Sequence, residues 1–196
     1  MQSIQTVSEN TIYVGASDRR LAKFENLFPI PRGVSYNAYV ILDEKTALLD
    51  TADASVGAQF LENVAAALDG RKLDYLIVDH MEPDHAAMIE AVLVRWPDLR
   101  LVVNAKTLPM LKMYFPTDSA AIDDALVVKE GDTLDLGKHK LTFVMAPMVH
   151  WPEVMMTFDT TTGTLFSADA FGTFGALEGA LFADAVSYTH LRAHET

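Results

Sequence analysis

The sequence predicts an α/β fold in which two β-sheets pack face to face with helices on the outside. Up to about residue 120, short β-rich runs alternate with amphipathic helical segments, and from there to residue 185 the pattern is mainly that of β-strands. Half of the 196 residues are hydrophobic and 21% are charged, which suits one domain with a sizeable core rather than a disordered chain.

The alternating part should contain strands and helices in turn. We expect its strands at Thr11–Gly15, Asn37–Leu42, Thr46–Asp50, Asp74–Asp79 and Leu101–Asn104. We expect its helices where apolar residues recur every three or four positions, at Ser55–Leu68, Asp84–Trp96 and Thr107–Phe115. Gly70 and Pro116 mark the ends of the first and third helices.

The later part should be a run of strands separated by glycine-containing turns at Gly131 and Gly163. These strands are expected at Ala125–Val128, Thr133–Leu136, Lys140–Met145, Val154–Phe158 and Leu165–Ser167. We found no internal repeat and no low-complexity linker that would divide the chain.

The composition disfavours several classes of partner. The net charge is -12, with 27 acidic and 15 basic residues, whereas nucleic acids and anionic membrane surfaces attract clustered Lys and Arg. No apolar run is long enough to span a bilayer, and the N-terminal segment lacks the features of a signal peptide. With no cysteine, disulfides and thiolate ligands are excluded. We expect a soluble cytoplasmic protein that binds neither nucleic acid nor membranes.

The last eleven residues, Val186–Thr196, read VSYTHLRAHET and differ in composition from what precedes them. All eleven match one reading frame of a commonly used transposase sequencing adapter; the alternative is a genuine polar tail. We therefore expect the native sequence to occupy residues 1–185 and to be incomplete at its C-terminus. We assign no function to His190 or His194.

The segment Asp79–His85, DHMEPDH, concentrates metal-binding side chains between a predicted buried strand and a predicted helix. His80, Glu82 and Asp84 are spaced by two in a strand-to-helix turn, so their side chains can converge, and imidazole with carboxylate suits iron, zinc or manganese. Each residue also has an ordinary explanation: Asp84 as a helix N-cap, His85 as a surface or core histidine, Glu82 as a solvated loop residue. Four such residues in six positions favour a metal site.

Two further candidates follow predicted strands. His150 comes after the strand at 140–145, and Asp169 lies just after the strand at 165–167. His150 could be a satisfied histidine in an aromatic turn and Asp169 a strand-end cap, but strand ends are where open sheets usually place ligands. We therefore expect both to converge with the 79–85 segment on one site.

The pattern HxExDH, followed by a histidine and then an aspartate at strand ends, resembles the metallo-β-lactamase superfamily. Hydrolases of that superfamily carry HxHxDH, and Glu82 in place of the second histidine resembles the flavodiiron proteins (A-type flavoproteins), including flavorubredoxin. The resemblance extends over nearly the whole chain to residue 185, through TALLDT, NAKT, VVKEGDTLDLG, APMVHWPEVMMTFD and LFSADAFGTFGAL. It implies a metallo-β-lactamase-like αββα sandwich, incomplete at the C-terminus.

The resemblance also implies roles for the candidate residues. His80, Glu82 and His150 correspond to ligands of one iron, Asp84 to a ligand of the other, and Asp169 to the carboxylate bridging both. The last histidine ligand of the family has no counterpart in this chain. His85 matches a position described as non-coordinating, from which it would orient Asp84 or a bound oxygen species.

The activity implied is reduction of dioxygen to water, of nitric oxide to nitrous oxide, or both, at two iron ions. The electrons would come from FMN in a C-terminal flavodoxin-like domain that these residues do not include, so this chain alone is expected to be inactive. Partners would be a second subunit in a head-to-tail homodimer and a rubredoxin-type or flavin-reductase electron donor. Trp151 is a candidate for facing the flavin, with core packing as the alternative.

Two other functions stay open from the sequence. One is a zinc-dependent hydrolase of the same fold, acting through a metal-activated hydroxide, which Glu82 disfavours. The other is a non-catalytic fragment with an incomplete site. The substrate preference between dioxygen and nitric oxide is not encoded in any of these motifs.

Overall fold

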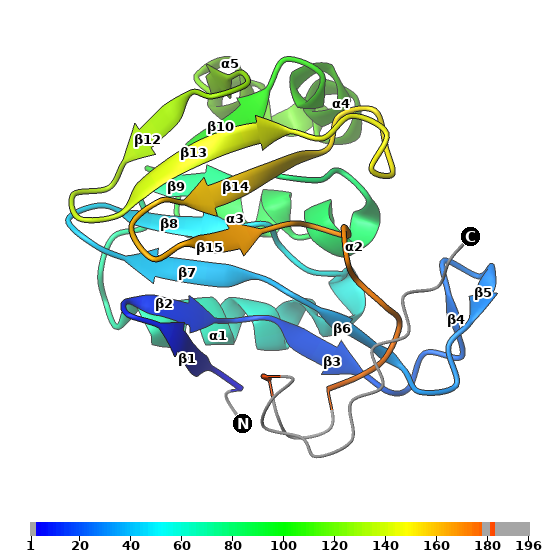
Figure 1. Ribbon diagram of the computed structural model, residues 1–196. Helices are drawn as coiled ribbons and strands as arrows, with labels where there is room; N and C mark the ends of the chain where they lie inside the picture. Colours follow the sequence, from blue (N-terminus) through cyan, green and yellow to red (C-terminus); the bar gives the residue numbers. More distant parts are fainter. Residues whose placement is uncertain (1–2, 178–180, 183–196) are drawn as a thin grey trace.

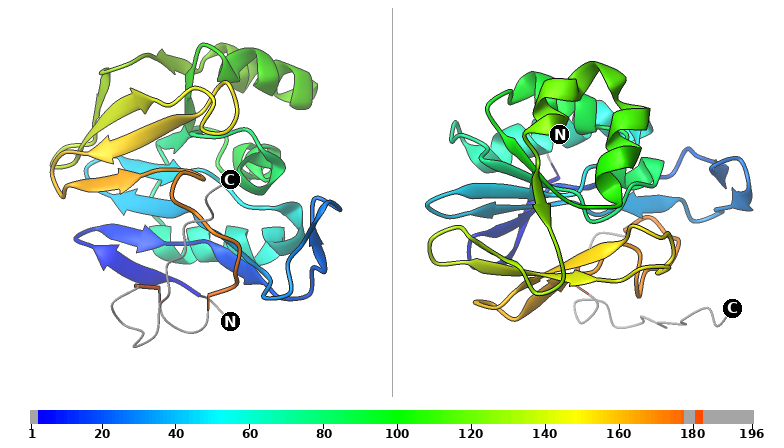
Figure 2. Two further views of the ribbon diagram at one scale, coloured as in Figure 1. Left: turned by 45° about the vertical axis from the view of Figure 1, so that its right-hand side comes forward. Right: turned by 90° about the horizontal axis from the view of Figure 1, so that it is seen from above.

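The computed structural model describes residues 3–177 and 181–182. A seven-stranded and a four-stranded β-sheet pack against each other, and the helices lie on the far side of the larger sheet (Figures 1 and 2). The predicted α/β fold of two packed sheets with helices outside is confirmed. In the described part of the chain no helix covers the outer face of the smaller sheet (Figure 2).

The larger sheet is mixed. In sheet order its strands are β1 (Gln5–Ser8), β2 (Thr11–Tyr13), β7 (Tyr39–Leu42), β8 (Thr46–Leu49), β9 (Tyr75–Ile77), β10 (Arg100–Asn104) and β11 (Leu126–Val128). Strands β8 to β11 are parallel, and the others pair antiparallel. The carboxyl ends of the parallel strands therefore meet at one edge, where ligands commonly bind.

The helices cover the outer face of this sheet. They are η1 (Ala54–Val56), α1 (Gly57–Leu68), α2 (Pro83–Ala86), α3 (Ile89–Arg95), α4 (Thr107–Tyr114), η2 (Pro116–Asp118) and α5 (Ser119–Asp123). Phe60, Val64 and Leu68 of α1 are fully buried, as their helical spacing predicts. None of the helices described is long and apolar enough to cross a membrane.

The prediction of one continuous helix at 84–96 is wrong, because the structure has two separate helices there, α2 and α3. The N–H of Met88 donates to Thr51 Oγ1 at 3.3 Å instead of continuing the helical ladder. Thr51 Oγ1 also donates to the carbonyl of His85 at 2.6 Å. These two contacts fix α2 to the residues after β8, which the local sequence of the helix does not reveal.

The smaller sheet is antiparallel throughout and consists of β12 (Thr133–Asp135), β13 (Lys140–Met145), β14 (Met155–Asp159) and β15 (Thr164–Phe166). Its inner face packs on the larger sheet through Phe143, Met155 and Leu141, which are fully buried. Since β13 and β15 both pair antiparallel with β14, their carboxyl ends lie at the same edge.

The sequence analysis did not predict several short elements. They are β1, α5 and the two-stranded pairs formed by β3 (Ala16–Asp18) with β6 (Val34–Tyr36) and β4 (Lys23–Phe24) with β5 (Phe28–Pro29). Strands of two or three residues are too short for a period-two pattern to appear. The predicted boundary near residue 185 and the segment Val186–Thr196, with His190 and His194, lie outside the described residues.

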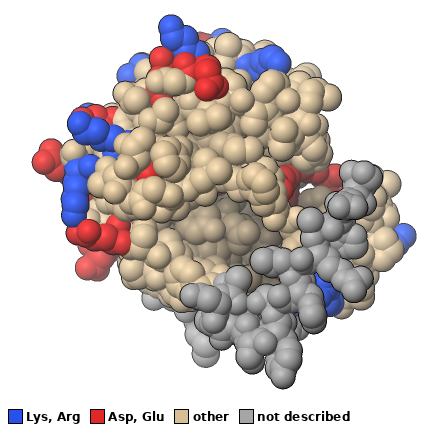
Figure 3. Space-filling view, in the orientation of Figure 1, with Lys and Arg blue, Asp and Glu red and all other residues tan. Residues whose placement is uncertain are grey.

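The front of the molecule is hollowed beside β15, and its charged side chains gather mainly towards the upper and left margins (Figure 3). A cavity of about 500 Å³ there is lined largely by apolar side chains, among them Tyr39, Leu49 and Phe166. Asp50 and Asp79 form part of its wall. The cavity thus reaches the residues that support the carboxyl edge of the larger sheet.

A buried polar pair joins the turns at the opposite end of the smaller sheet. His139 Nδ1 donates to Asp159 Oδ2 at 2.8 Å, and both side chains are almost fully buried. Asp159 also accepts from the N–H of Thr161 and the hydroxyl of Thr162. Burial alone would raise the pKa of Asp159, but the hydrogen bonds from Thr162 and His139 hold it below its usual range.

We expect Asp159→Asn to lower the free energy of unfolding at pH 7 and to flatten its dependence on pH in acid. The carboxylate has a lowered pKa in the folded protein, so its stabilisation is present above its ordinary pKa of about 3.9 and fades as the pH falls towards the lowered value. Urea unfolding between pH 3 and 7 measures this, with Asp135→Asn, at an exposed position of β12, as control. Identical pH dependence in Asp159→Asn and the wild type would contradict it.

Candidate metal centre

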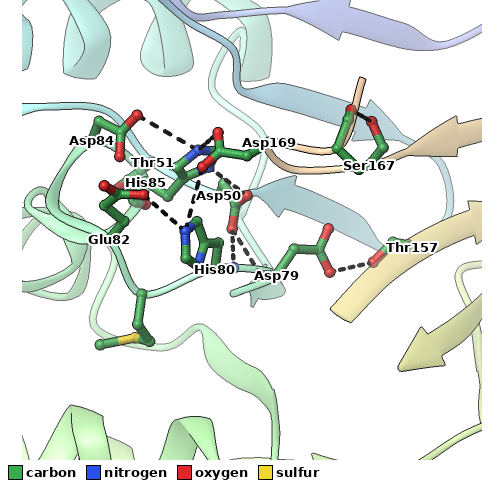
Figure 4. Close-up of polar contacts among 12 residues, drawn as sticks. Asp50, Thr51, Asp79, His80, Glu82, Asp84, His85, Thr157, Ser167 and Asp169 are labelled. Atoms are coloured by element: carbon green, nitrogen blue, oxygen red, sulfur yellow. Dashed lines mark hydrogen bonds and ion pairs between the residues drawn. The ribbon is translucent and has the colours of Figure 1, made fainter. Parts of the chain in front are cut away.

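The predicted site residues lie at the common carboxyl edge of the two sheets. His80 follows β9, His150 follows β13 and Asp169 follows β15. Figure 4 shows the side chains that point towards one another from this edge: His80, Glu82, Asp84, His85 and Asp169. The two sheets therefore face the same point from opposite sides.

The local backbone explains how the 79–85 segment presents several donors at once. Glu82 is the N-cap residue of α2, with extended backbone and no side-chain capping bond, and Pro83 occupies the first helical turn. Asp84 lies in that first turn and is not the N-cap. The Glu82 carboxylate is therefore free of the usual capping role and turns to the cluster.

The first group of potential donors comprises His80, Glu82, His150 and Asp169, whose ligand atoms lie within 4.8 Å of one another. Glu82 Oε2 lies 2.7 Å from His150 Nε2 and 3.1 Å from His80 Nε2. Asp169 Oδ2 lies 3.2 Å from His150 Nε2 and 3.4 Å from His80 Nε2. All four donors face one small volume.

The second group comprises Asp84, His85 and Asp169, under the same 4.8 Å limit. His85 Nε2 lies 2.8 Å from Asp169 Oδ1 and 3.7 Å from Asp84 Oδ2. The two oxygens of Asp169 are thus divided between the two groups. His85, expected from the resemblance to support the ligands, directs a ring nitrogen at the same point as Asp84.

Two carboxylates that the sequence analysis did not single out accept hydrogen bonds from the Nδ1 atoms of His80 and His85. Asp50 Oδ2 accepts from His85 Nδ1 at 3.0 Å, and Glu153 Oε1 accepts from His80 Nδ1 at 2.8 Å. Asp50 ends the predicted strand TALLD, so its strand-end position was an available signal. Glu153 lies in the loop before β14, and its sequence context carries no such signal.

Burial and charge are balanced within the cluster. Burial by itself would lower the pKa of His80, but hydrogen bonds with the surrounding carboxylates raise it to about 11. Burial would raise the pKa of Asp169, but hydrogen bonds from His80 and His85 hold it well below its usual range. Burial raises the pKa of Asp84 to about 7, with the charges of Asp169 and Glu82 acting in the same direction.

One side of the cluster is open. The side chains of His150 and Asp169 are 55% and 34% exposed, whereas His80 is fully buried. Trp151 is half-buried, and its ring meets that of His80 edge-on with the centroids 5.4 Å apart. Met148 and Phe171, close in sequence to His150 and Asp169, are 70% and 89% exposed. Two exposed apolar side chains thus lie close in sequence to the two exposed donors.

The donor set fits a pair of metal ions. Nitrogen and carboxylate oxygen donors without thiolates suit iron, zinc or manganese. Asp84 Oδ1 is buried and has no hydrogen-bond partner in the described part of the protein, which is costly unless a ligand occupies it. A carboxylate with one oxygen in each group, as Asp169 has, is suited to bridge two ions.

Known proteins are similar to this chain in sequence. A family model described as "ODP family beta lactamase" matches residues 34–194. The putative diflavin flavoprotein A 1 of Thermosynechococcus vestitus is 38% identical over 169 residues, covering 85% of this chain and 28% of the relative. The anaerobic nitric oxide reductase flavorubredoxin of Klebsiella pneumoniae is 37% identical over 187 residues, covering 94% of this chain and 38% of the relative.

Solved structures share the fold. The flavodiiron protein from Giardia intestinalis superimposes with a TM-score of 0.89 at 27% identity, over 97% of this chain and 46% of that one. The rubredoxin oxygen:oxidoreductase from Desulfovibrio gigas gives 0.87 at 31% identity, over 94% and 45%. This chain thus spans less than half the length of these proteins. It belongs to the ODP family of β-lactamase-like domains, the family of the flavodiiron proteins and flavorubredoxins.

Proposed function

We propose that this chain is the metal-binding domain of a diiron oxidoreductase that reduces dioxygen to water, nitric oxide to nitrous oxide, or both. The observation that carries the proposal is the pair of donor groups sharing the carboxylate of Asp169. The names of the relatives support it, since one is a nitric oxide reductase flavorubredoxin and another a rubredoxin oxygen:oxidoreductase.

The proposed ligands follow the two groups of donors. We assign His80, Glu82 and His150 to the first iron, Asp84 to the second, and Asp169 to the bridge between them. We add His85 to the second iron, in place of the supporting role that the resemblance implied, because Asp50 holds its Nδ1 and leaves Nε2 facing Asp84 and Asp169.

Glu82 favours iron redox chemistry over the alternative of a zinc hydrolase. Its carboxylate lies among the donors of the first group, in contact with both His80 and His150. An anionic oxygen donor at this point adds negative charge, which stabilises ferric iron and disfavours a zinc-bound hydroxide. The related hydrolases have a neutral imidazole at the corresponding position of their motif.

A pair of ferrous ions held by these residues would supply two electrons to a bound diatomic molecule. Converting two nitric oxide molecules to nitrous oxide and water takes two electrons and two protons, whereas dioxygen to water takes four of each. The carboxylates of Glu82, Asp84 and Asp169 offset the charge of the oxidised centre. The exposed side, at His150 and Asp169, leaves room for a small substrate to enter.

We place the electron source outside this chain, as FMN in a flavodoxin-like domain recharged by a rubredoxin-type or flavin-reductase donor. The exposed apolar side chains of Met148 and Phe171, near His150 and Asp169 in sequence, support a head-to-tail dimer in which a second subunit covers the open side. Trp151 lies against His80 beneath this opening, so it packs on a proposed ligand whether or not it meets a flavin.

The two donor groups should respond separately to substitution. In anaerobic Fe(II) titrations we expect Glu82→Gln to weaken the first position, His85→Gln the second, and Asp169→Asn both. Losing even a residue that supports a ligand costs about 10–100-fold in affinity, so losing a donor should cost at least about tenfold. Glu90→Gln, an exposed glutamate on α3, serves as control. Unchanged iron content in all three variants would refute the ligand assignment.

An experiment with this chain can distinguish the proposed gas reduction from the alternative hydrolase activity. With no electron donor added, we expect the ferrous protein to be oxidised once by dioxygen or nitric oxide, without repeated turnover. Optical spectra and gas electrodes follow the reaction, and Asp169→Asn should slow it strongly. The zinc-loaded chain should not cleave β-lactam, ester or thioester substrates. Zinc-dependent cleavage together with ferrous protein inert to both gases would instead establish the hydrolase.

A further inference from the structure

Glu153 is a buried carboxylate beside the first metal position whose function the ligand assignment leaves unexplained. Its side chain is fully buried, and its Oε1 accepts from His80 Nδ1 at 2.8 Å and from the N–H of Met81 at 3.0 Å. An ionised carboxylate only accepts hydrogen bonds, so the imidazole nitrogen is the donor. His80 Nε2 then faces Glu82 and Asp169.

The other oxygen of Glu153 lowers the stability of the folded protein. Oε2 is buried and has no hydrogen-bond partner among the residues that the structure describes. Burying a carboxylate with an oxygen that accepts no hydrogen bond costs stability that an apolar side chain would not. The contribution of Glu153 is therefore to be sought in its effect on His80.

The loop that carries Glu153 is braced from the larger sheet by Asn104, within the motif NAKT. Asn104 Nδ2 donates to the carbonyl of Glu153 at 2.6 Å, while its Oδ1 accepts from the N–H groups of Lys106 and Thr107 at the start of α4. Lys106 Nζ donates to the carbonyl of Pro152 at 3.1 Å. The end of β10 thus fixes the position of the carboxylate.

We propose that Glu153, braced by Asn104, is a positioning residue that holds His80 as its Nδ1–H tautomer and presents Nε2 to the first metal ion. A carboxylate behind a ligand histidine fixes the ring orientation and raises its basicity. The proposal rests on the metal centre proposed above. His150 offers an internal contrast, because no hydrogen bond to its Nδ1 occurs within the described ranges.

A second buried histidine–carboxylate pair, His139 with Asp159, serves as a control for the pair of His80 and Glu153. His139 Nδ1 and Asp159 Oδ2 are also 2.8 Å apart and buried, but neither belongs to a group of potential metal donors in the described residues. Asp159→Asn and Glu153→Gln therefore make the same chemical change to the same kind of pair. Only the second lies behind a proposed ligand.

The test measures Zn(II) affinity of the full chain by chelator competition, with melting temperatures of the metal-free proteins alongside. We expect Glu153→Leu to weaken zinc binding by about 10–100-fold, and Glu153→Gln, which keeps an acceptor oxygen, by less. We expect Asp159→Asn to leave zinc affinity unchanged. In ¹⁵N NMR of the zinc-loaded chain, His80 Nδ1–H should exchange slowly in the wild type and fast, like that of His150, in Glu153→Leu.

Two results would overturn the inference. One is wild-type zinc affinity and slow His80 Nδ1–H exchange in both Glu153 variants. The other is an equal loss of affinity in Glu153→Gln and Asp159→Asn, which would show a general effect of stability. A wild-type chain that binds no zinc would remove the proposed metal centre itself. Should Glu153→Leu fail to fold, the affinity and exchange rate of Glu153→Gln still decide the question.

Discussion

The carboxylate of Asp50 accepts hydrogen bonds from the N–H of Asp79 at 2.7 Å, from that of His80 at 3.4 Å and from Nδ1 of His85 at 3.0 Å. Asp50 follows β8 and the 79–85 segment follows β9, so one buried charge joins the ends of two parallel strands. It also orients the ring of His85 and accepts from the backbone N–H of His80. The convergence of the segment on the site depends on this interaction, which ties its backbone and the ring of His85 to the end of β8.

The same edge must keep several ionisable side chains out of water, which is tolerable only when each has a partner of opposite charge. His80 and His85 each lie between carboxylates on both ring nitrogens. The cluster without metal is therefore a network of compensating charges, and metal ions would replace the protons on the facing nitrogens. Asp84 Oδ1, which has no partner among the described residues, marks the place where this compensation is incomplete.

Assembly of the centre requires both sheets. The N–H of Met155 donates to the carbonyl of Asp79 at 3.0 Å, and Thr157 Oγ1 donates to Asp79 Oδ1 at 2.8 Å, so β14 is joined directly to the end of β9. His150 and Asp169 reach the cluster only when this packing is in place. A metal ion shared by the two sheets would accordingly stabilise the folded state, since it binds that state and not the separated strands.

The sequence by itself determined the alternation of strands and helices, the second run of strands and the convergence at strand ends of His80, Glu82, Asp84, His150 and Asp169. Periodicity and strand-end position are local properties, and both can be recognised directly in the amino-acid sequence. The break after α2, the placement of His85 Nε2 beside Asp84 and the carboxylates behind the histidines were decided by tertiary structure. Glu153 lies 73 positions from His80, and their contact exists only because β14 packs across the end of β9. No local pattern encodes a pairing that depends on how two sheets are set against each other.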